Sequence, residues 1–165
     1  MTDTFAGRPI EGDIQHYVEP TEQRDPQEFI DSLEKLLATP GVEAVRWNQY
    51  TPYFNDGEPC VFNIYSAYIK IEGDDDYEDG DYGDGYRSTY DLYDYDVSKG
   101  SDYDSRRVFN PIGGFDSKVL HEALSDFEST LSSGYHNTIL GKKFGDPATV
   151  TATKDGFSVE FYDHE

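Results

Sequence analysis

Residues 149–162 read TVTATKDGFSVEFY, two runs of alternating polar and apolar side chains on either side of Asp155 and Gly156. An Asp-Gly pair between such runs is typical of a two-residue hairpin turn, because both turn positions need positive φ angles. The segment therefore predicts an antiparallel hairpin in which two cross-strand pairs share one face. These pairs are Val150 with Phe161 and Ala152 with Val159.

Two more strands are predicted upstream of this hairpin. Val42–Tyr50 and Cys60–Ile71 are rich in residues that favour strands, notably Val, Ile, Phe and Tyr. Residues 51–59 between them contain two prolines and several turn residues, which interrupt strand hydrogen bonding. Because both faces of Cys60–Ile71 are fairly apolar, we expect this strand to be central in the sheet.

Two helices complete the predicted core. Asp25 can cap a helix that starts at Pro26, and Asp116 or Ser117 can cap a second one. Their apolar stripes are Phe29, Ile30, Leu33, Leu36 and Leu37 in the first, and Leu120, Ala123, Leu124, Phe127 and Leu131 in the second. The predicted fold class is therefore α+β, an antiparallel sheet with two helices packed on one face.

An acidic insertion rich in tyrosine, residues 72–104, interrupts this pattern. Its 13 Asp or Glu residues against two Lys or Arg give a formal charge of −11, about half of the −21 of the chain. Residues 73–85 are too polar to pack, and we expect a long acidic hairpin loop there. Residues 86–97 resume alternation and predict a strand. Its faces would carry Tyr93, Tyr95 and Val97 on one side and Asp94 and Asp96 on the other.

The length of 165 residues suits one domain with its own core. Residues 1–24 lack periodicity and are expected to form an extended N-terminal arm, whereas residues 25–165 are expected to form a single α+β domain. The single cysteine, Cys60, excludes an internal disulfide and favours a reducing compartment. No apolar run is long enough to span a membrane, and the start of the chain lacks the pattern of a signal peptide. We therefore expect an intracellular protein.

Two segments of the chain carry a family resemblance. Residues 47–60 read WNQYTPYFNDGEPC, and residues 145–165 contain a KDG turn and end in YDHE. Both resemble an uncharacterised family of small acidic proteins of tailed bacteriophages and prophages. The resemblance implies a phage-encoded protein made in the cytoplasm of the bacterial host. Because that family has no assigned activity, the resemblance implies no functional residues, and the acidic insertion is not part of the shared pattern.

Metal sites find little support in the sequence. The histidines show no zinc-ligand spacing, and Ser125 stands where a zincin motif beginning at His121 needs its second histidine. Residues 74–84 offer many carboxylates, but Asp79 occupies the position that an EF-hand loop reserves for glycine. We expect no metal site and no cofactor, with weak Ca²⁺ binding by residues 74–84 as the remaining option.

Enzymatic motifs are also missing from the sequence, which has no G-x-S-x-G, P-loop or dinucleotide fingerprint. With so many carboxylates, sequence alone cannot nominate a catalytic pair. We therefore expect that the protein is not an enzyme. An alternative is a ligand pocket formed by aromatic residues near the 47–60 turn, although packing is the commoner role for such residues. The candidates are Trp47, Tyr50, Tyr53 and Phe54.

Some carboxylates in the insertion have a predicted spacing close to that of the phosphates along a nucleic-acid strand. Residues i and i+2 of a strand point the same way about 6.6 Å apart, near the spacing of successive phosphates. Asp94/Asp96 and Asp102/Asp104 would form such rows, and interleaved tyrosines would add contact area. The predicted partner-binding residues are Asp91, Asp94, Asp96, Asp102, Asp104, Tyr93, Tyr95 and Tyr103.

The charge narrows the list of partners. It opposes direct contact with nucleic acid or with an anionic membrane and attracts basic proteins. We expect a phage accessory protein that binds a basic host protein, as a nucleic-acid mimic or as an inhibitor of a DNA-handling or defence protein. The alternatives are a solvated loop, a surface adapted to high salt, a structural phage protein, and a ligand-sequestering protein or small enzyme. The sequence leaves the oligomeric state open.

Overall fold

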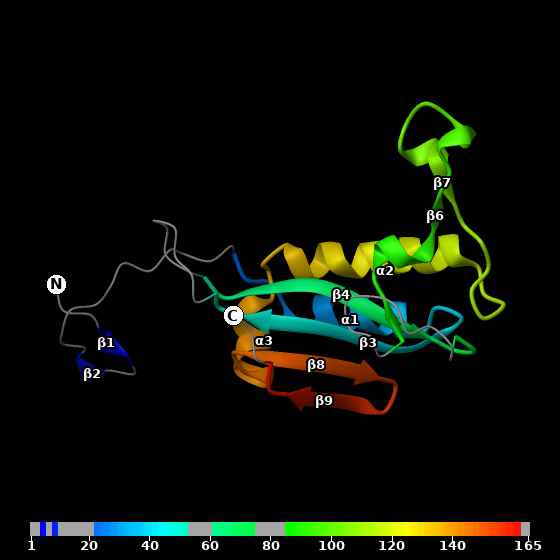
Figure 1. The fold of residues 1–165 in the computed structure, drawn as a ribbon. Helices are drawn as coiled ribbons and strands as arrows, with labels where there is room; N and C mark the ends of the chain where they lie inside the picture. The colour runs from blue at the N-terminus through cyan, green and yellow to red at the C-terminus, as the bar shows by residue number, and fades with distance from the viewer. Residues whose placement is uncertain (1–3, 6–7, 10–21, 53–60, 75–84, 163–165) are drawn as a thin grey trace.

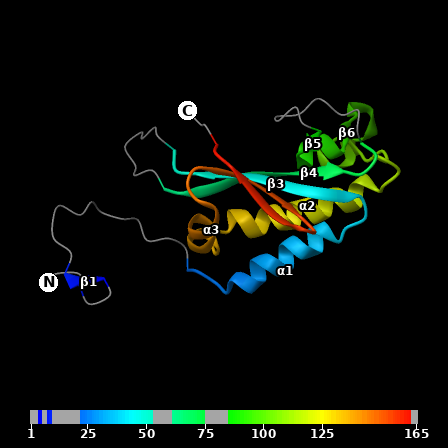
Figure 2. The same cartoon turned by 90° about the horizontal axis from the view of Figure 1, so that it is seen from below.

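The structure is a computed structural model that describes residues 4–5, 8–9, 22–52, 61–74 and 85–162. An antiparallel five-stranded sheet has the order β5-β4-β3-β8-β9. The strands are β3 Val42–Tyr50, β4 Asn63–Ile71, β5 Tyr86–Arg87, β8 Ala148–Thr153 and β9 Gly156–Glu160. The α-helices are α1 Pro26–Leu37, α2 Ser117–Ser132 and α3 Asn137–Phe144. Helices α1 and α2 lie side by side on one face of the sheet (Figures 1 and 2), which confirms the predicted α+β class.

Short elements complete the described chain. Two-residue strands pair as β1 with β2 and as β6 with β7, and three 3₁₀ helices lie between β5 and β7. Their bounds are β1 Thr4–Phe5, β2 Arg8–Pro9, η1 Thr89–Leu92, β6 Asp94–Tyr95, η2 Val97–Lys99, η3 Asp104–Arg106 and β7 Arg107–Val108. None of the described helices is both long enough and apolar enough to cross a membrane.

The two long helices begin where their capping residues predict. The Asp25 carboxylate accepts a hydrogen bond of 2.9 Å from the backbone N–H of Gln27 at the start of α1. Asp116 does the same for α2, accepting from the N–H of Lys118 at 3.0 Å. Such caps satisfy N–H groups that have no partner inside the helix. Both helix predictions are confirmed, and α3 adds a third helix over Asn137–Phe144.

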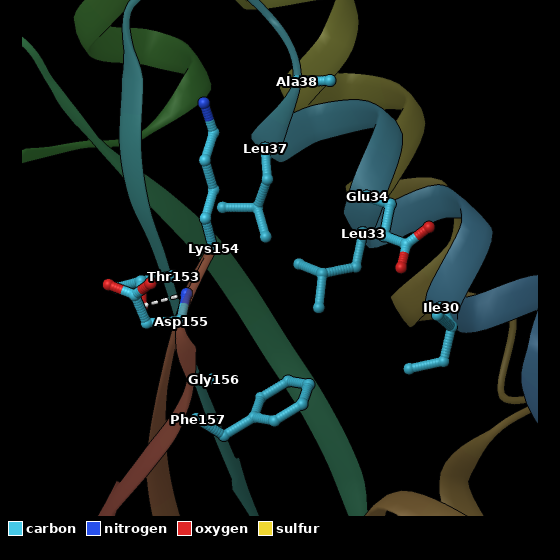
Figure 3. A pocket seen from close by; sticks show the side chains of 10 residues that line it. All are labelled: Ile30, Leu33, Glu34, Leu37, Ala38, Thr153, Lys154, Asp155, Gly156 and Phe157. Carbon is cyan, nitrogen blue, oxygen red and sulfur yellow. Dashed lines mark hydrogen bonds between the residues drawn. The ribbon is translucent and has the colours of Figure 1, made fainter.

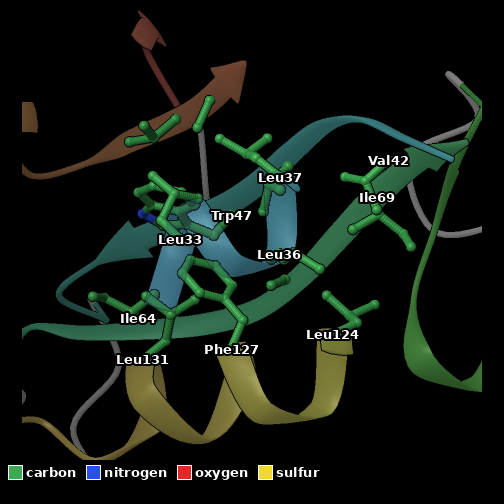
Figure 4. Close-up of a cluster of buried hydrophobic side chains, with 14 of the residues drawn as sticks. Leu33, Leu36, Leu37, Val42, Trp47, Ile64, Ile69, Leu124, Phe127 and Leu131 are labelled. Carbon is green, nitrogen blue, oxygen red and sulfur yellow. The ribbon is translucent and has the colours of Figure 1, made fainter. Parts of the chain in front are cut away.

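The core lies between these helices and the sheet (Figure 4). Trp47 of β3 is fully buried, with its ring 5.8 Å from the ring of Phe29 in α1 and 5.8 Å from that of Phe127 in α2. Aromatic pairs at this separation stabilise a core beyond the area that they bury. The predicted helix stripes supply the other side of the core, with Leu33, Leu36, Leu37, Leu120, Leu124 and Leu131 all buried.

The strand order corrects one prediction. The centre of the sheet is β3, which pairs with β4 along one edge and with β8 along the other. Strand β4 pairs with β5 at only two residues, Ile69 and Lys70, so most of its other edge has no strand partner among the described residues. The apolar residues on both faces of β4 instead reflect two packing layers. Ile69 belongs to the main core, and Tyr68 packs with other residues on the opposite face.

A β-bulge in β4 is coupled to helix α2. Between the pairs Trp47↔Ala67 and Gln49↔Ile64, β4 contains one residue more than β3. The backbone N–H of Ala67 donates to the Glu128 carboxylate of α2 at 3.1 Å. Burial raises the pKa of Glu128, and the Ala67 hydrogen bond opposes that rise. Glu128 of α2 therefore provides a hydrogen-bond acceptor for the backbone N–H of Ala67 next to the bulge.

The C-terminal hairpin forms with a different register from the predicted one. Thr153 pairs with Gly156, so Lys154 and Asp155 are the two loop residues and Gly156 takes a φ of 144° at the start of β9. Every predicted cross-strand pair is therefore displaced by two residues. Because the side-chain period of a strand is two, the same residues keep the same face. The observed pairs are Val150 with Val159 and Ala152 with Phe157.

The strand predicted for residues 86–97 is wrong, because a 3₁₀ turn interrupts it. The Asp91 carboxylate accepts hydrogen bonds from the N–H of Ser88 at 2.9 Å and from its hydroxyl at 3.0 Å, which closes η1. Arg87 binds both carboxylate oxygens of Asp74, at 2.6 and 3.1 Å, and the carbonyl of Asp91 at 2.7 Å. Local polar side chains thus replace the ladder of a strand. Of the predicted acidic loop, residues 75–84 lie outside the described residues.

A buried glutamine ties α3 to the sheet. Gln49 of β3 is fully buried, and its side-chain oxygen accepts from the indole N–H of Trp47 at 3.1 Å. Its amide nitrogen donates to the carbonyls of Leu140 at 3.0 Å and Gly145 at 2.7 Å. One polar side chain therefore holds the C-terminal end of α3, from Leu140 to Gly145, against the central strand β3.

Candidate partner-binding site

The described part of the insertion leads into a projecting hairpin, residues 93–109, here called the lobe. Strands β6 and β7 form its stem, with Asp94 opposite Val108 and Tyr95 opposite Arg107. Figure 1 shows the lobe standing away from the helix–sheet body on the side of α2. A hairpin in this position can reach a partner before the rest of the surface does.

Aromatic packing anchors the base of the lobe. Leu92, which precedes it, is buried in the main core. The Tyr93 ring lies 5.7 Å from the ring of Phe109 and 5.6 Å from that of His121 in α2, and Phe109 is 5.4 Å from His121. Burial lowers the pKa of His121, and the nearby charge of Arg107 lowers it further. The His121 ring thus completes an aromatic contact between the lobe and α2.

Two carboxylates shape the tip of the lobe. Asp96 accepts from the backbone N–H of Ser98 at 2.9 Å and from its hydroxyl at 2.6 Å, capping η2. Asp102 accepts from the N–H of Ser105 at 2.8 Å. These hydrogen bonds favour the charged carboxylate, so the pKa values of Asp96 and Asp102 fall below their usual range. The tip is therefore held by its own side chains.

A close approach across the tip requires glycine. Arg106 donates from Nε to the carbonyl of Gly100 at 2.7 Å and from a terminal nitrogen to the Tyr95 hydroxyl at 3.3 Å. A Cβ atom at position 100 would overlap the side chain of Ser105. The small residue lets the two halves of the tip meet.

Of the two predicted carboxylate pairs, Asp94 and Asp96 flank the extended residue Tyr95 of β6, whereas Asp102 and Asp104 do not form a strand-like row. Tyr103, between Asp102 and Asp104, has helical angles of φ −60° and ψ −46°, so this pair lacks the spacing of a strand. Asp94 accepts from the Asn110 amide at 2.7 Å, and Asp104 pairs with Arg107 at 3.1 Å. The fifth predicted carboxylate, Asp91, closes η1 beneath the lobe. Asp94, Asp102 and Asp104 remain exposed to solvent.

The predicted tyrosines divide into an anchor and a contact pair. Tyr93 is half-buried, its hydroxyl is hydrogen-bonded to that of Tyr103, and burial is the main cause that raises its pKa to about 12. Tyr95 and Tyr103 are exposed, with ring centroids 5.2 Å apart. Val97 beside them is exposed as well, so the tip presents an apolar and aromatic surface.

The charge of the insertion is unevenly distributed. The lobe contains four Asp residues and three Lys or Arg residues, a formal charge of −1. Residues 75–84 contain six Asp or Glu residues and no Lys or Arg, and they lie outside the described residues. The lobe is thus a polar and aromatic surface, and eight residues separate it in sequence from a strongly negative segment.

The described residues offer no evident metal centre. They contain no group of three or more His, Cys, Asp or Glu side chains placed to hold an ion. Asp74, the first residue of the segment considered for Ca²⁺, is bound to Arg87. The rest of that segment lies outside the described residues.

The aromatic-pocket alternative is not assembled among the described residues. Trp47 is buried in the core, whereas Tyr50 points to the opposite face of β3 and stacks on Tyr65 with ring centroids 4.3 Å apart. Tyr53 and Phe54 lie outside the described residues. Trp47 and Tyr50 therefore do not line one surface pocket.

The residues that order the lobe were not among the predicted site residues. Ser98, Ser105 and Gly100 determine the tip, while Arg106 and Asn110 bind groups across it. The spacings Asp-x-Ser and Asp-x-x-Ser are typical of local side-chain turns and would have indicated two turns in place of a flexible segment. Comparison of the chain with protein-family models, with curated proteins and with solved structures finds no match.

Proposed function

We propose that the protein is a non-enzymatic binding protein that holds a basic partner protein through the lobe. The observation that carries this proposal is the tip itself, where Tyr95, Val97 and Tyr103 are exposed beside exposed carboxylates. Apolar side chains on an ordered projection are costly to hydrate, and they are typical of surfaces that a partner covers. Because the tip is held by its own hydrogen bonds, little ordering entropy is lost on binding.

The chemistry of the lobe favours a basic partner. Exposed carboxylates accept hydrogen bonds from Lys and Arg, and tyrosine faces attract the same cations. The acidic segment, residues 75–84, raises the rate of encounter with a positively charged surface. The resemblance to phage proteins favours a host DNA-handling or defence protein as the partner. The turn at Tyr103 argues against imitation of a regular phosphate row as the means of recognition.

Two sets of substitutions test this proposal. The contact variant combines Tyr95→Ser with Val97→Ser, and the charge variant combines Asp94→Asn with Asp104→Asn. The full chain and both variants are used to capture proteins from a bacterial lysate, and the retained proteins are identified by mass spectrometry. The partner found is then purified and titrated against each form at low and high NaCl concentration.

The expected result separates the two contributions. The contact variant should bind at least tenfold more weakly at every salt concentration, which corresponds to about 1.4 kcal/mol or more. The charge variant should weaken binding mainly at low salt, because exposed charges are screened at high salt. Matched controls outside the lobe, Tyr90→Ser on η1 and Asp155→Asn in the C-terminal hairpin, should bind like the unmodified chain. Equal capture by all forms would refute the proposal.

A further inference from the structure

Strand β9 leaves an open edge on the main sheet. It pairs with β8 on one side, and no described strand pairs with its other side. All five residues of β9 are exposed, and its pairing with β8 runs without a bulge or a proline. Edge strands are usually protected by such features or by charges within the strand, because unpaired N–H and C=O groups recruit other strands. The edge of β9 lacks a bulge and a proline, and its one charged residue, Glu160, lies at the C-terminal end of the strand.

An apolar row follows this edge on the helix side of the sheet. Phe157, Val159 and Phe161 alternate along the chain and are 45%, 48% and 76% exposed. Val159 lies beside buried Val150, and the Phe157 ring is 5.0 Å from that of Phe144 in α3, which places the row on the face that the helices cover.

A groove separates this row from helix α1. It has a volume of about 530 Å³, and Phe157 faces it from the hairpin while Ile30 and Leu33 face it from α1 (Figure 3). Helix α1 packs against β3 and α2. The apolar row therefore borders a hollow that side chains of this chain do not fill among the described residues.

The hairpin register determines which backbone groups point outward. A two-residue loop closes on a hydrogen-bonded pair, here Thr153 with Gly156, and such pairs alternate along the strands. The backbone N–H and C=O groups of Gly156 and Ser158 therefore point to β8. Those of Phe157 and Val159 point away from the sheet, where another strand can bind them.

We propose that β9 pairs with β9 of a second copy of this chain, antiparallel across a twofold axis at Val159, so that one sheet runs through both copies. This register places Val159 opposite its own counterpart and Phe157 opposite Phe161 of the other copy. Cross-strand aromatic pairs stabilise a sheet. Glu160 lies opposite Ser158 of the other copy, so no like charges are directly opposed within β9. A self-complementary patch of this kind suits the closed symmetry of a dimer.

The oligomeric state of the purified full chain tests the proposal. Light scattering after size exclusion, or sedimentation, should give twice the mass of 18.7 kDa. Val159→Lys places two like charges on the axis and should weaken dimerisation at least tenfold. The matched control is Val119→Lys on α2, where the native side chain is 46% exposed, and it should remain dimeric. Both variants reduce the net charge of −21 equally, so a general charge effect cannot explain a difference between them.

A cross-link tests the register directly. In a Cys60→Ser background, Val159→Cys places a thiol opposite its own copy and should give a disulfide-linked dimer on oxidation, whereas Val119→Cys should not. Raising the NaCl concentration should strengthen the dimer by screening repulsion between two acidic chains. Three results would each overturn the proposal. They are a monomer at all protein concentrations, a dimer that persists in Val159→Lys, and a Val159→Cys chain that does not cross-link.

Discussion

Replacing Gln49 with methionine should destabilise the protein by about 2–5 kcal/mol. Methionine has a similar volume, so the main effect is on hydrogen bonding, and the buried indole N–H of Trp47 and the carbonyl of Gly145 lose the partner that Gln49 supplies. A buried group without a partner costs about 1–3 kcal/mol, which is the expected loss at the Trp47 indole, and the half-buried Gly145 carbonyl adds about 1–2 kcal/mol, which together give the stated range. The Leu140 carbonyl lies within α3, where helical hydrogen bonding continues, so it adds less.

Urea unfolding followed by far-ultraviolet circular dichroism measures this change. Gln27→Met on the exposed side of α1 is the matched control and should alter the free energy of unfolding by no more than about 0.5 kcal/mol. A double-mutant cycle with Trp47→Phe removes the indole donor and should show a coupling of about 1 kcal/mol with Gln49→Met. A loss of less than about 1 kcal/mol in Gln49→Met would refute the reasoning that the bridge between β3 and α3 is a major source of stability.

Further predictions concern pH and the lobe. Because the pKa of Glu128 is raised above 4.5 by burial, its contribution to stability is complete below pH 4.5 and is lost as pH rises through the raised value. As pH rises from 4.5 to 7, Glu128→Gln should therefore gain stability relative to the unmodified chain, whereas Glu122→Gln on the same helix should not. Urea midpoints of Glu128→Gln and of the unmodified chain that change in parallel with pH would contradict this prediction. Burial lowers the pKa of His136 below 6.5, so stability should fall as pH drops below 6.5. His136→Leu should flatten that fall in thermal melts, and an unchanged slope would exclude His136 as its source. Gly100→Ala should loosen the tip by crowding Ser105, seen as faster amide exchange in residues 96–106 with little change in the urea midpoint; unchanged exchange would show that the close approach is not needed.

The helix–sheet body was largely predictable from local patterns. Asp25 and Asp116 marked both helix starts, because capping chemistry depends on residues within one turn. The strand order was harder to predict from the sequence. Apolar residues on both faces of β4 suit the centre of the sheet, but they suit equally well the position next to it that β4 occupies. The turn of the last hairpin was displaced by one residue, because one glycine can serve as a loop residue or as the first residue of the following strand.

The candidate site was harder to predict for a physical reason. Alternation of Tyr and Asp in residues 93–97 has the period of a strand, but hydrogen bonds from Ser88, Ser98 and Ser105 to nearby aspartates favour turns. Only some of the predicted partner-binding residues lie together at the tip of the lobe. Asp91 and Tyr93 lie at its base, whereas Tyr95 and Tyr103 are exposed at the tip. The high density of acidic residues marked residues 72–104 as a candidate binding segment, but it did not predict how the chain folds there.

The order of strands in the sheet has a consequence for synthesis of the chain. Strand β3 meets β4 across a short connection, but Val45 of β3 pairs with Ala152 of β8, which lies 107 residues later. Bacterial and eukaryotic ribosomes add roughly 5–20 residues per second, so β3 waits on the order of 5–20 s for this neighbour. During that interval one edge of the central strand has no sheet partner, and contacts so distant in sequence also slow folding after release. A chaperone that covers this edge of β3 would therefore protect the nascent chain until β8 has been made.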